Sequence, residues 1–368
     1  LSLNHSVRRI AAIGHLFMWP LVATLSALWS LTPSLSAYHG LQLFFTMLVG
    51  LVLQERFGLA GLLRLLFYAL GTALVLSFLV SGSGVPGSIN HHGEWEGVFS
   101  HKNVLGAFMM TLFYVSLALL LSGWRPLFTL AAMAGSVILL GMSGSAGALV
   151  TFLLLLSVVP FLAAARRGVG AIGLAASLSA ATLAVAVLAI VSAGLDPVGL
   201  ALDALGKDRT LTGRTVLWDF GAATFAEHPI LGVGYKAYWS SWATSSAYLR
   251  YFIQQDLWFF HNNYLEVVVA VGLVGLAAFA YGLAVAVWTI LSRFRREPTP
   301  ENGWAVLILV NVLVLSLVEN PLFWNHSLFQ VLFTAIAVRT AAEVAARRAA
   351  RRSRTEAAAA VRRGYGLS

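Results

Sequence analysis

Long apolar runs dominate this chain, and their length limits what it can fold into more than any other feature. Each run reaches or approaches the roughly 20 residues that an α-helix needs to cross the hydrocarbon core of a bilayer. The runs cover residues 11–31, 39–53, 59–80, 104–122, 127–142, 147–165, 170–194, 261–292, 303–320 and 325–344. We therefore predict an all-α polytopic membrane protein with about ten, and at most about twelve, transmembrane helices.

The balance of apolar and charged residues supports this prediction. Of 368 residues, 59% are hydrophobic and 11% are charged, whereas soluble globular proteins carry about 25% charged residues. Cysteine is absent, which excludes disulfides, thiolate nucleophiles and thiolate metal ligands. The first apolar run is too long for a conventional signal peptide and is followed by further runs, so we expect it to act as a signal anchor.

Basic residues predict the orientation, because Lys and Arg beside transmembrane helices stay on the cytoplasmic side. With a cytoplasmic N-terminus, 18 of the 24 Lys and Arg residues fall in cytoplasmic segments. The other six are Lys102, Lys207, Arg209, Arg214, Lys236 and Arg250. We predict that both termini are cytoplasmic. Topology and a basic tail near anionic headgroups account for the net charge of +9, so no nucleic-acid partner is expected.

These assignments divide the chain into four parts. The parts are N-terminal transmembrane helices over 1–194, a large non-cytoplasmic loop with short helices over 195–260, C-terminal transmembrane helices over 261–344 and a basic cytoplasmic tail over 345–368.

The large loop has its own pattern. Residues 213–227 have helical spacing with Thr212 as a candidate N-cap, and His228 and Pro229 are predicted to end that helix. The many aromatic residues that follow suit either the membrane interface or the faces of sugars.

A second polar segment, residues 81–103, lies on the same predicted side. It supplies His91, His92, Glu94, Glu96, His101 and Lys102. These residues lack the helical spacing of two histidines that is typical of zinc sites, so we expect neither a metal nor another cofactor.

Three short blocks carry a family resemblance. They read Phe99-Ser100-His101-Lys102-Asn103-x-x-Gly106, Gly213-Arg214-x3-Trp218 and His261-Asn262-x9-Gly272-x-x-Gly275. Their order and topology resemble the bacterial O-antigen ligase and polymerase superfamily over roughly residues 95–325. The resemblance implies a metal-independent glycosyltransferase of the GT-C type in the bacterial inner membrane. Such an enzyme joins a glycan from a polyprenyl-diphosphate carrier to an acceptor hydroxyl on the periplasmic side.

One element departs from the family pattern. Members commonly carry Ser-x-Ser-Arg at the start of a central span, and the arginine is thought to meet the diphosphate. The corresponding element here is Ser143-Gly144-Ser145-Ala146. Three alternatives stay open: Lys102, Arg209 or Arg250 replaces the arginine, this branch handles its carrier differently, or the protein is less active.

The chemistry of the reaction suggests roles for individual residues. Negative charge grows on the leaving diphosphate, and the planar fork of Arg214 suits its stabilisation. The acceptor hydroxyl needs a base, for which His261 is the candidate. A structural role in capping or anchoring the helix is the alternative for His261. Glu319 is predicted to be structural. Candidate substrate-binding residues are His101, Lys102, Asn103, Arg209, Trp218, Arg250, Asn262 and Glu266.

Several functions fit these features. We favour a polymerase, which uses another lipid-linked repeat as acceptor, over a ligase, which uses lipid A-core. A transporter or flippase for a lipid-linked glycan is the alternative from another class, and a non-catalytic scaffold is a third. The expected partners are the polyprenyl-diphosphate-linked donor, the glycan or lipid A-core acceptor, the bilayer and other polysaccharide-assembly proteins.

Overall fold

The structure is a computed structural model that describes residues 13–165, 176, 214–241, 244–253 and 257–339. Helices account for all the regular secondary structure of these residues, apart from one isolated bridge between Ile89 and Trp95. The predicted all-α polytopic membrane fold is confirmed.

Short helices form two groups in the chain order, one before α3 and one before α12. The described helices are η1 (Gly14–Phe17), α2 (Met18–Leu25), η2 (Ser26–Leu28), α3 (Pro33–Gly82), α4 (Lys102–Leu121), α5 (Pro126–Met142), α6 (Ala146–Ala165), α9 (Arg214–Glu227), α10 (Ala237–Ser240), α11 (Ser246–Ile253), α12 (Asn263–Arg296) and α13 (Pro300–Leu315), and an apolar helix over Leu328–Arg339. By length and composition, α3, α4, α6 and α12 can each cross a membrane.

The predicted spans correspond to these helices with two qualifications. The spans predicted at 39–53 and 59–80 form one helix, α3, which is broken at Gly58, where φ is 60°. The span predicted at 170–194 falls outside the described residues.

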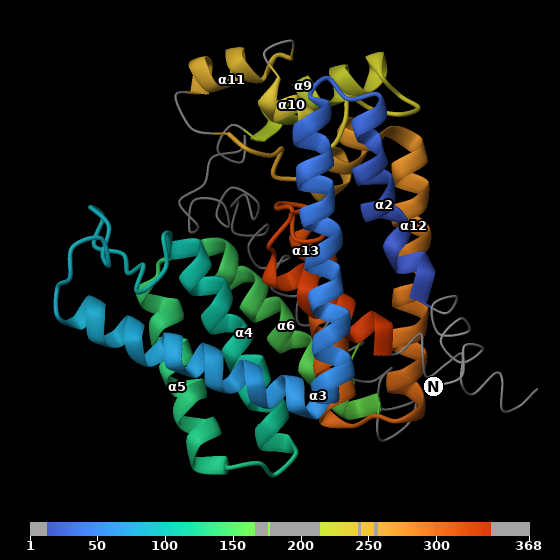
Figure 1. The fold of residues 1–368 in the computed structure, drawn as a ribbon. Helices are drawn as coiled ribbons and strands as arrows, with labels where there is room; N and C mark the ends of the chain where they lie inside the picture. Colours follow the sequence, from blue (N-terminus) through green and yellow to red (C-terminus); the bar gives the residue numbers. More distant parts are fainter. Residues whose placement is uncertain (1–12, 166–175, 177–213, 242–243, 254–256, 340–368) are drawn as a thin grey trace, which may run out of the picture.

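The spanning helices form two groups (Figure 1). The first limb of α3 stands beside α2, which in turn contacts α12. The second limb of α3 runs across α4 and α5, which pack against each other and against α6. Helix α13 joins the two groups, since it contacts α12, α4 and α6. The loop helices α9, α10 and α11 lie together beyond one end of α2, α3 and α12.

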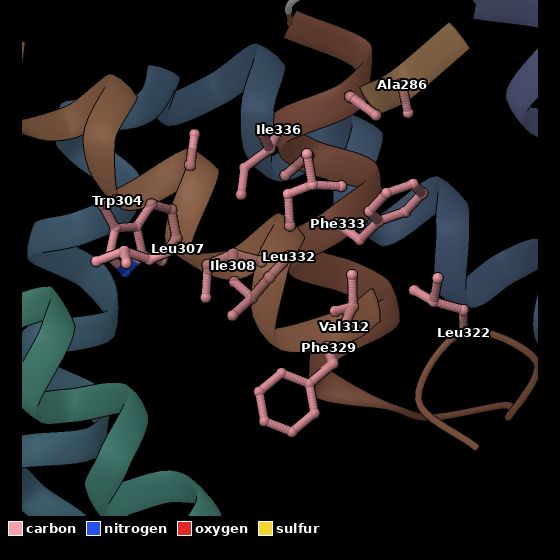
Figure 2. Close-up of a cluster of buried hydrophobic side chains, with 14 of the residues drawn as sticks. Ala286, Trp304, Leu307, Ile308, Val312, Leu322, Phe329, Leu332, Phe333 and Ile336 are labelled. Carbon is pink, nitrogen blue, oxygen red and sulfur yellow. The ribbon is translucent and has the colours of Figure 1, made fainter. Parts of the chain in front are cut away.

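The junction between the groups is tightly packed. Figure 2 shows large side chains of α13, such as Trp304 and Ile308, in one cluster with those of the following helix, such as Leu332 and Phe333, and Ile308 lies beside Leu332. These side chains are almost completely buried. Burying a large apolar side chain in water-soluble proteins stabilises them by about 1.5–3 kcal/mol, but lipid tails are as apolar as leucine, so close packing is the main stabilising factor here.

Helix α12 is not continuous, although the sequence predicts one long helix. At Gly272 the backbone has φ 61° and ψ −162°. Because a helical amide donates to the carbonyl four residues earlier, this break separates the amides of Leu273 and Val274 from the carbonyls of Val269 and Ala270. Four strong hydrogen-bonding groups are thereby freed within a helix that is apolar enough to cross a membrane, and in hydrocarbon each unsatisfied group costs several kcal/mol.

Residues 229–234 of the loop provide a partner for each freed group. The amides of Val233 and Gly234 donate to the two carbonyls at 3.0 and 2.8 Å. The carbonyls of Pro229 and Ile230 accept from the two amides at 2.9 and 3.2 Å. The middle of the large loop is therefore hydrogen-bonded to the backbone of α12 on both sides of the break.

Candidate functional site

His261 occupies a strained turn immediately before α12. Its φ is 52°, a left-handed conformation that non-glycine residues adopt mainly where the surroundings impose it, often at functional sites. Asn262 caps the helix: its side-chain oxygen accepts from the amides of Tyr264 and Leu265 at 3.1 and 3.0 Å. The capping alternative for His261 is therefore wrong, and the imidazole is free for another contact.

That contact is with Glu319. The Nδ1 atom of His261 lies 3.2 and 3.3 Å from the two carboxylate oxygens, and both side chains are about one-third exposed. A carboxylate at Nδ1 favours the tautomer with the proton on Nδ1, which leaves Nε2 as the acceptor. A histidine held in this way by a carboxylate is the arrangement of a general base and its orienting group. The role of Glu319, predicted to be structural, therefore includes a direct contact with the imidazole.

The turn that carries Glu319 is fastened to the start of α12. The amide of Asn263 donates to the carbonyl of Ser316 at 2.9 Å, and the side-chain oxygen of Asn263 accepts from the amide of Leu322 at 3.0 Å. Two elements far apart in the chain therefore hold the His261–Glu319 pair from both sides.

One aromatic ring packs against the imidazole, and a second ring packs against the first. The ring of Phe259 lies 4.3 Å from that of His261, and Trp324 lies 5.1 Å from Phe259 between ring centroids. Phe259, supported by Trp324, therefore limits the movement of the His261 ring on one side.

Two buried charged residues lie next to this turn. The Glu266 carboxylate is buried and accepts from the amide of Phe260 at 3.0 Å. The Lys236 ammonium, also buried, sits 3.0 Å from the centroid of the Trp324 ring. Burial lowers the pKa of Lys236 to about 7, an effect that the charge of Glu266 opposes. Sequence reasoning missed Lys236 as a site residue; a lysine within an aromatic stretch was the available signal.

Helix α9 brings another block of the sequence to the same turn. The indole nitrogen of Trp218 donates to the carbonyl of Phe260 at 2.9 Å. Arg214 begins α9, one helical turn before Trp218, so the backbone positions of the two share a face. The side chain of Arg214, the loop cation Arg209 and the candidate cap Thr212 lie outside the described parts of the structure. The predicted helix over 213–227 is confirmed.

Arg250 is engaged within the loop. Its guanidinium donates to the carbonyl of Trp239 and to the hydroxyl of Ser246, and lies 5.9 Å from the Trp258 ring centroid. These contacts tie α11 to α10.

The second polar segment forms a separate cluster. His101 caps α4, with its Nδ1 accepting from the amide of Asn103 at 3.1 Å. Lys102 donates to Glu94 at 2.5 Å, and this hydrogen bond lowers the pKa of Glu94. The side-chain oxygen of Asn103 accepts from Ser145 at 2.9 Å. The segment between α3 and α4 lies well apart from α9 and α12 in Figure 1, so the structure does not bring these residues to the His261 turn.

The same cluster adjoins the element that departs from the family pattern. Helix α6 begins at Ala146, and a Cβ placed on Gly144 would come within 2.7 Å of the Glu94 carboxylate that binds Lys102. Of the cations considered as replacements for the missing arginine, Lys102 is therefore near this element. Arg250 is held in the large loop. Within the described residues, no group of three His, Asp or Glu side chains could hold a metal ion.

Comparison with known proteins agrees with the resemblance seen in the sequence. The sequence profile of a family described as O-antigen ligase matches residues 128–280, which include most of α5, all of α6, the loop helices and the His261 turn. Over 346 residues the chain is 30% identical to the exopolysaccharide production protein ExoQ of Rhizobium meliloti (strain 1021), an alignment that covers 87% of this chain and 75% of that protein. This multi-pass membrane protein therefore belongs to the O-antigen ligase and polymerase superfamily.

Proposed function

We propose that this protein is a metal-independent glycosyltransferase of the GT-C type that moves a glycan from a polyprenyl-diphosphate carrier to an acceptor hydroxyl. The contact between His261 and Glu319 carries the proposal, because it joins a titratable ring to an orienting carboxylate at the end of a membrane helix. The superfamily acts on lipid-linked glycans, which agrees with such a site.

The proposed reaction exchanges one bond for another at the anomeric carbon of the donor sugar. The acceptor hydroxyl gives its proton to Nε2 of His261 as its oxygen attacks this carbon. The bond from the carbon to the carrier phosphate breaks, and its electron pair leaves with the diphosphate. Glu319 keeps the imidazole in the required tautomer and stabilises the imidazolium that forms.

Arg214 is proposed to stabilise the leaving diphosphate. Negative charge increases on that group in the transition state, so a cation there lowers the barrier more than it strengthens ground-state binding. The support is positional: α9 is attached to the His261 turn through Trp218. Asn262 and Trp218 stay predicted substrate-binding residues, although each already makes a hydrogen bond that stabilises the turn.

Replacement of Arg214 by lysine tests this role. The variant keeps the positive charge but loses the two parallel hydrogen bonds of the guanidinium, so we expect a fall in kcat of about 10- to 100-fold with normal expression. Turnover of a purified carrier-linked oligosaccharide by both proteins provides the measurement. Wild-type turnover by Arg214→Lys would contradict a bidentate contact with the diphosphate.

The polymerase is the preferred form of this activity. The similarity to an exopolysaccharide production protein extends over most of the chain, which favours assembly of a secreted polysaccharide over transfer to lipid A-core. Deletion of the gene should then abolish long glycan chains and leave single carrier-linked repeats. Gel and mass-spectrometric analysis of the extracted glycolipids provides the measurement, and accumulation of long carrier-linked chains would instead indicate a ligase.

We further propose that the His261 turn faces the periplasm and that the protein lies in the inner membrane with both termini in the cytoplasm. The excess of Lys and Arg on the opposite side of the predicted spans supports this orientation. In this orientation residues 195–260 form the large periplasmic loop between the transmembrane parts at 1–194 and 261–344. The basic tail at 345–368 then lies in the cytoplasm.

The break in α12 is the observation that would support the alternative of a transporter, because transporters bind substrates at broken helices. Here the groups freed at Gly272 already have partners in residues 229–234. This argues against a substrate site at the break. Transfer of the glycan by enzyme in detergent, without a sealed compartment, would exclude a purely transporting role.

A further inference from the structure

Two buried residues of opposite charge, Lys236 and Glu266, lie next to the turn that carries His261. Lys236 and Glu266 are the only lysine, arginine, aspartate or glutamate side chains that are buried among the residues the structure describes. They come from opposite sides of the same junction, Lys236 from the turn before α10 and Glu266 from the first turn of α12.

Lys236 is an unusual residue for this position. Its φ is 63°, so a residue with a full side chain occupies a left-handed conformation. No hydrogen-bond acceptor reaches its ammonium within the described structure. A buried amine without an acceptor is costly, and its surroundings must compensate through the negative charge of Glu266 and the face of Trp324.

The first connection from Lys236 to His261 runs through the backbone. Opposite charges on Lys236 and Glu266 attract each other, and the carboxylate of Glu266 accepts from the amide of Phe260 at 3.0 Å. Phe260 directly precedes His261, whose left-handed conformation depends on how that peptide is held. Ionised acceptors form the stronger hydrogen bonds.

The second connection runs through the aromatic rings. The ammonium of Lys236 lies on the face of Trp324 at 3.0 Å. Trp324 contacts Phe259 edge to face at 5.1 Å, and Phe259 lies against His261 at 4.3 Å. Lys236 therefore fixes the position of the Trp324 ring. Trp324 in turn supports Phe259, the ring that packs against the imidazole of His261.

We propose that Lys236 is a positioning residue for His261, acting through Glu266 on the turn and through Trp324 on the ring stack. Its effect on glycan transfer rests on the proposed role of His261 as the general base. Its effect on the position of the imidazole does not depend on that role. The lysine is buried behind the turn, so it acts on the histidine and not on the substrate.

Replacement of Lys236 by methionine removes the charge and keeps an unbranched chain over Trp324. In purified full-length protein we expect the His261 imidazole to become more accessible, so that diethyl pyrocarbonate modifies it faster than in wild type. Mass spectrometry of the His261 peptide measures this rate at one near-neutral pH. We also expect kcat with a polyprenyl-diphosphate-linked oligosaccharide to fall about 10- to 100-fold, the effect of a small displacement of a catalytic group, with little change in KM.

A second neutral substitution provides the test for action through Glu266. In Lys236→Met/Glu266→Gln the amide oxygen of glutamine accepts from Phe260 without needing a positive charge nearby. Replacing both members of a buried charge pair by neutral groups is often tolerated, whereas removing one is costly. We therefore expect the double variant to regain part of the lost kcat and to slow the modification of His261 towards the wild-type rate. Trp324→Leu keeps both charges and should also accelerate the modification, which provides a test if Lys236→Met does not fold.

The outcomes separate this inference from the proposed function. An unchanged modification rate in folded Lys236→Met overturns the positioning role even if His261→Ala is inactive. A double variant no better than the single one overturns the action through Glu266. A lower unfolding temperature with wild-type kcat also overturns it, since it shows a purely structural lysine. Faster modification together with normal transfer by His261→Ala supports the positioning of the ring and rejects the general base.

Discussion

Replacement of His261 by alanine should abolish glycan transfer while the carrier-linked donor still binds. A positioned general base contributes about 10²- to 10⁴-fold to the rate, and Arg214, the proposed contact for the diphosphate, is unchanged in this variant. Carrier-lipid binding and sugar transfer should be measured on one purified sample. Bound donor without transfer is the expected result.

The structure provides a matched control for this variant. His228 is an exposed histidine at the end of α9 in the same loop, and His228→Ala should retain the wild-type rate. Glu319→Gln should have an intermediate effect, because the amide still contacts Nδ1 but no longer stabilises the imidazolium by charge. Undiminished transfer by His261→Ala would leave the contact with Glu319 as a purely structural link between α12 and the turn after α13.

Replacement of Gly272 by alanine should prevent the protein from accumulating in folded form. The backbone angles at this position, φ 61° and ψ −162°, are adopted almost only by glycine. A Cβ atom there would lie 2.2 Å from the carbonyl oxygen of Ile230, which is itself bonded across the break in α12. Backbone strain of about 1–3 kcal/mol and overpacking of about 1–3 kcal/mol act together, against a marginal total stability.

Gly71 is the control for this substitution. It lies within α3, and a Cβ built on it meets no atom within 4 Å. Gly71→Ala should be neutral or stabilising by about 0.5–1 kcal/mol, because alanine loses less conformational freedom in a helix. Fluorescence-detected size-exclusion chromatography and thermal unfolding of both variants in detergent provide the measurement. Equal amounts of folded protein for both would show that the backbone at Gly272 can relax.

The sequence predicts the helices of this fold well because each transmembrane helix satisfies its own backbone, so length and hydropathy suffice to locate it. It does not predict the break at Gly272. That glycine, with Gly275 and Gly282, suggests only close helix packing. The break depends on partners from residues 229–234, and their arrival at α12 is a long-range event that no local pattern encodes.

For the candidate site as well, the sequence predicts individual residues but not their long-range contacts. His261 stands out because a polar motif meets an apolar run at that point. Its contact with Glu319 joins residues 58 positions apart, and the importance of Lys236 depends on burial by distant rings. The residues His101, Lys102 and Asn103 form an equally distinct motif, yet the structure bonds them within a different cluster. A motif identifies polar residues in an apolar chain but not which of them meet.

The insertion of residues 229–234 into α12 has a consequence for exchanging parts between relatives. A chimera that takes the large loop from one protein and the helix from another would have to rebuild four backbone hydrogen bonds and the close approach of the Ile230 and Leu231 backbone to Gly272. The transferable module therefore extends from the loop through the first residues after the break, and its C-terminal boundary belongs after Val274. Within that module, the loop and the beginning of α12 should be exchanged as one piece.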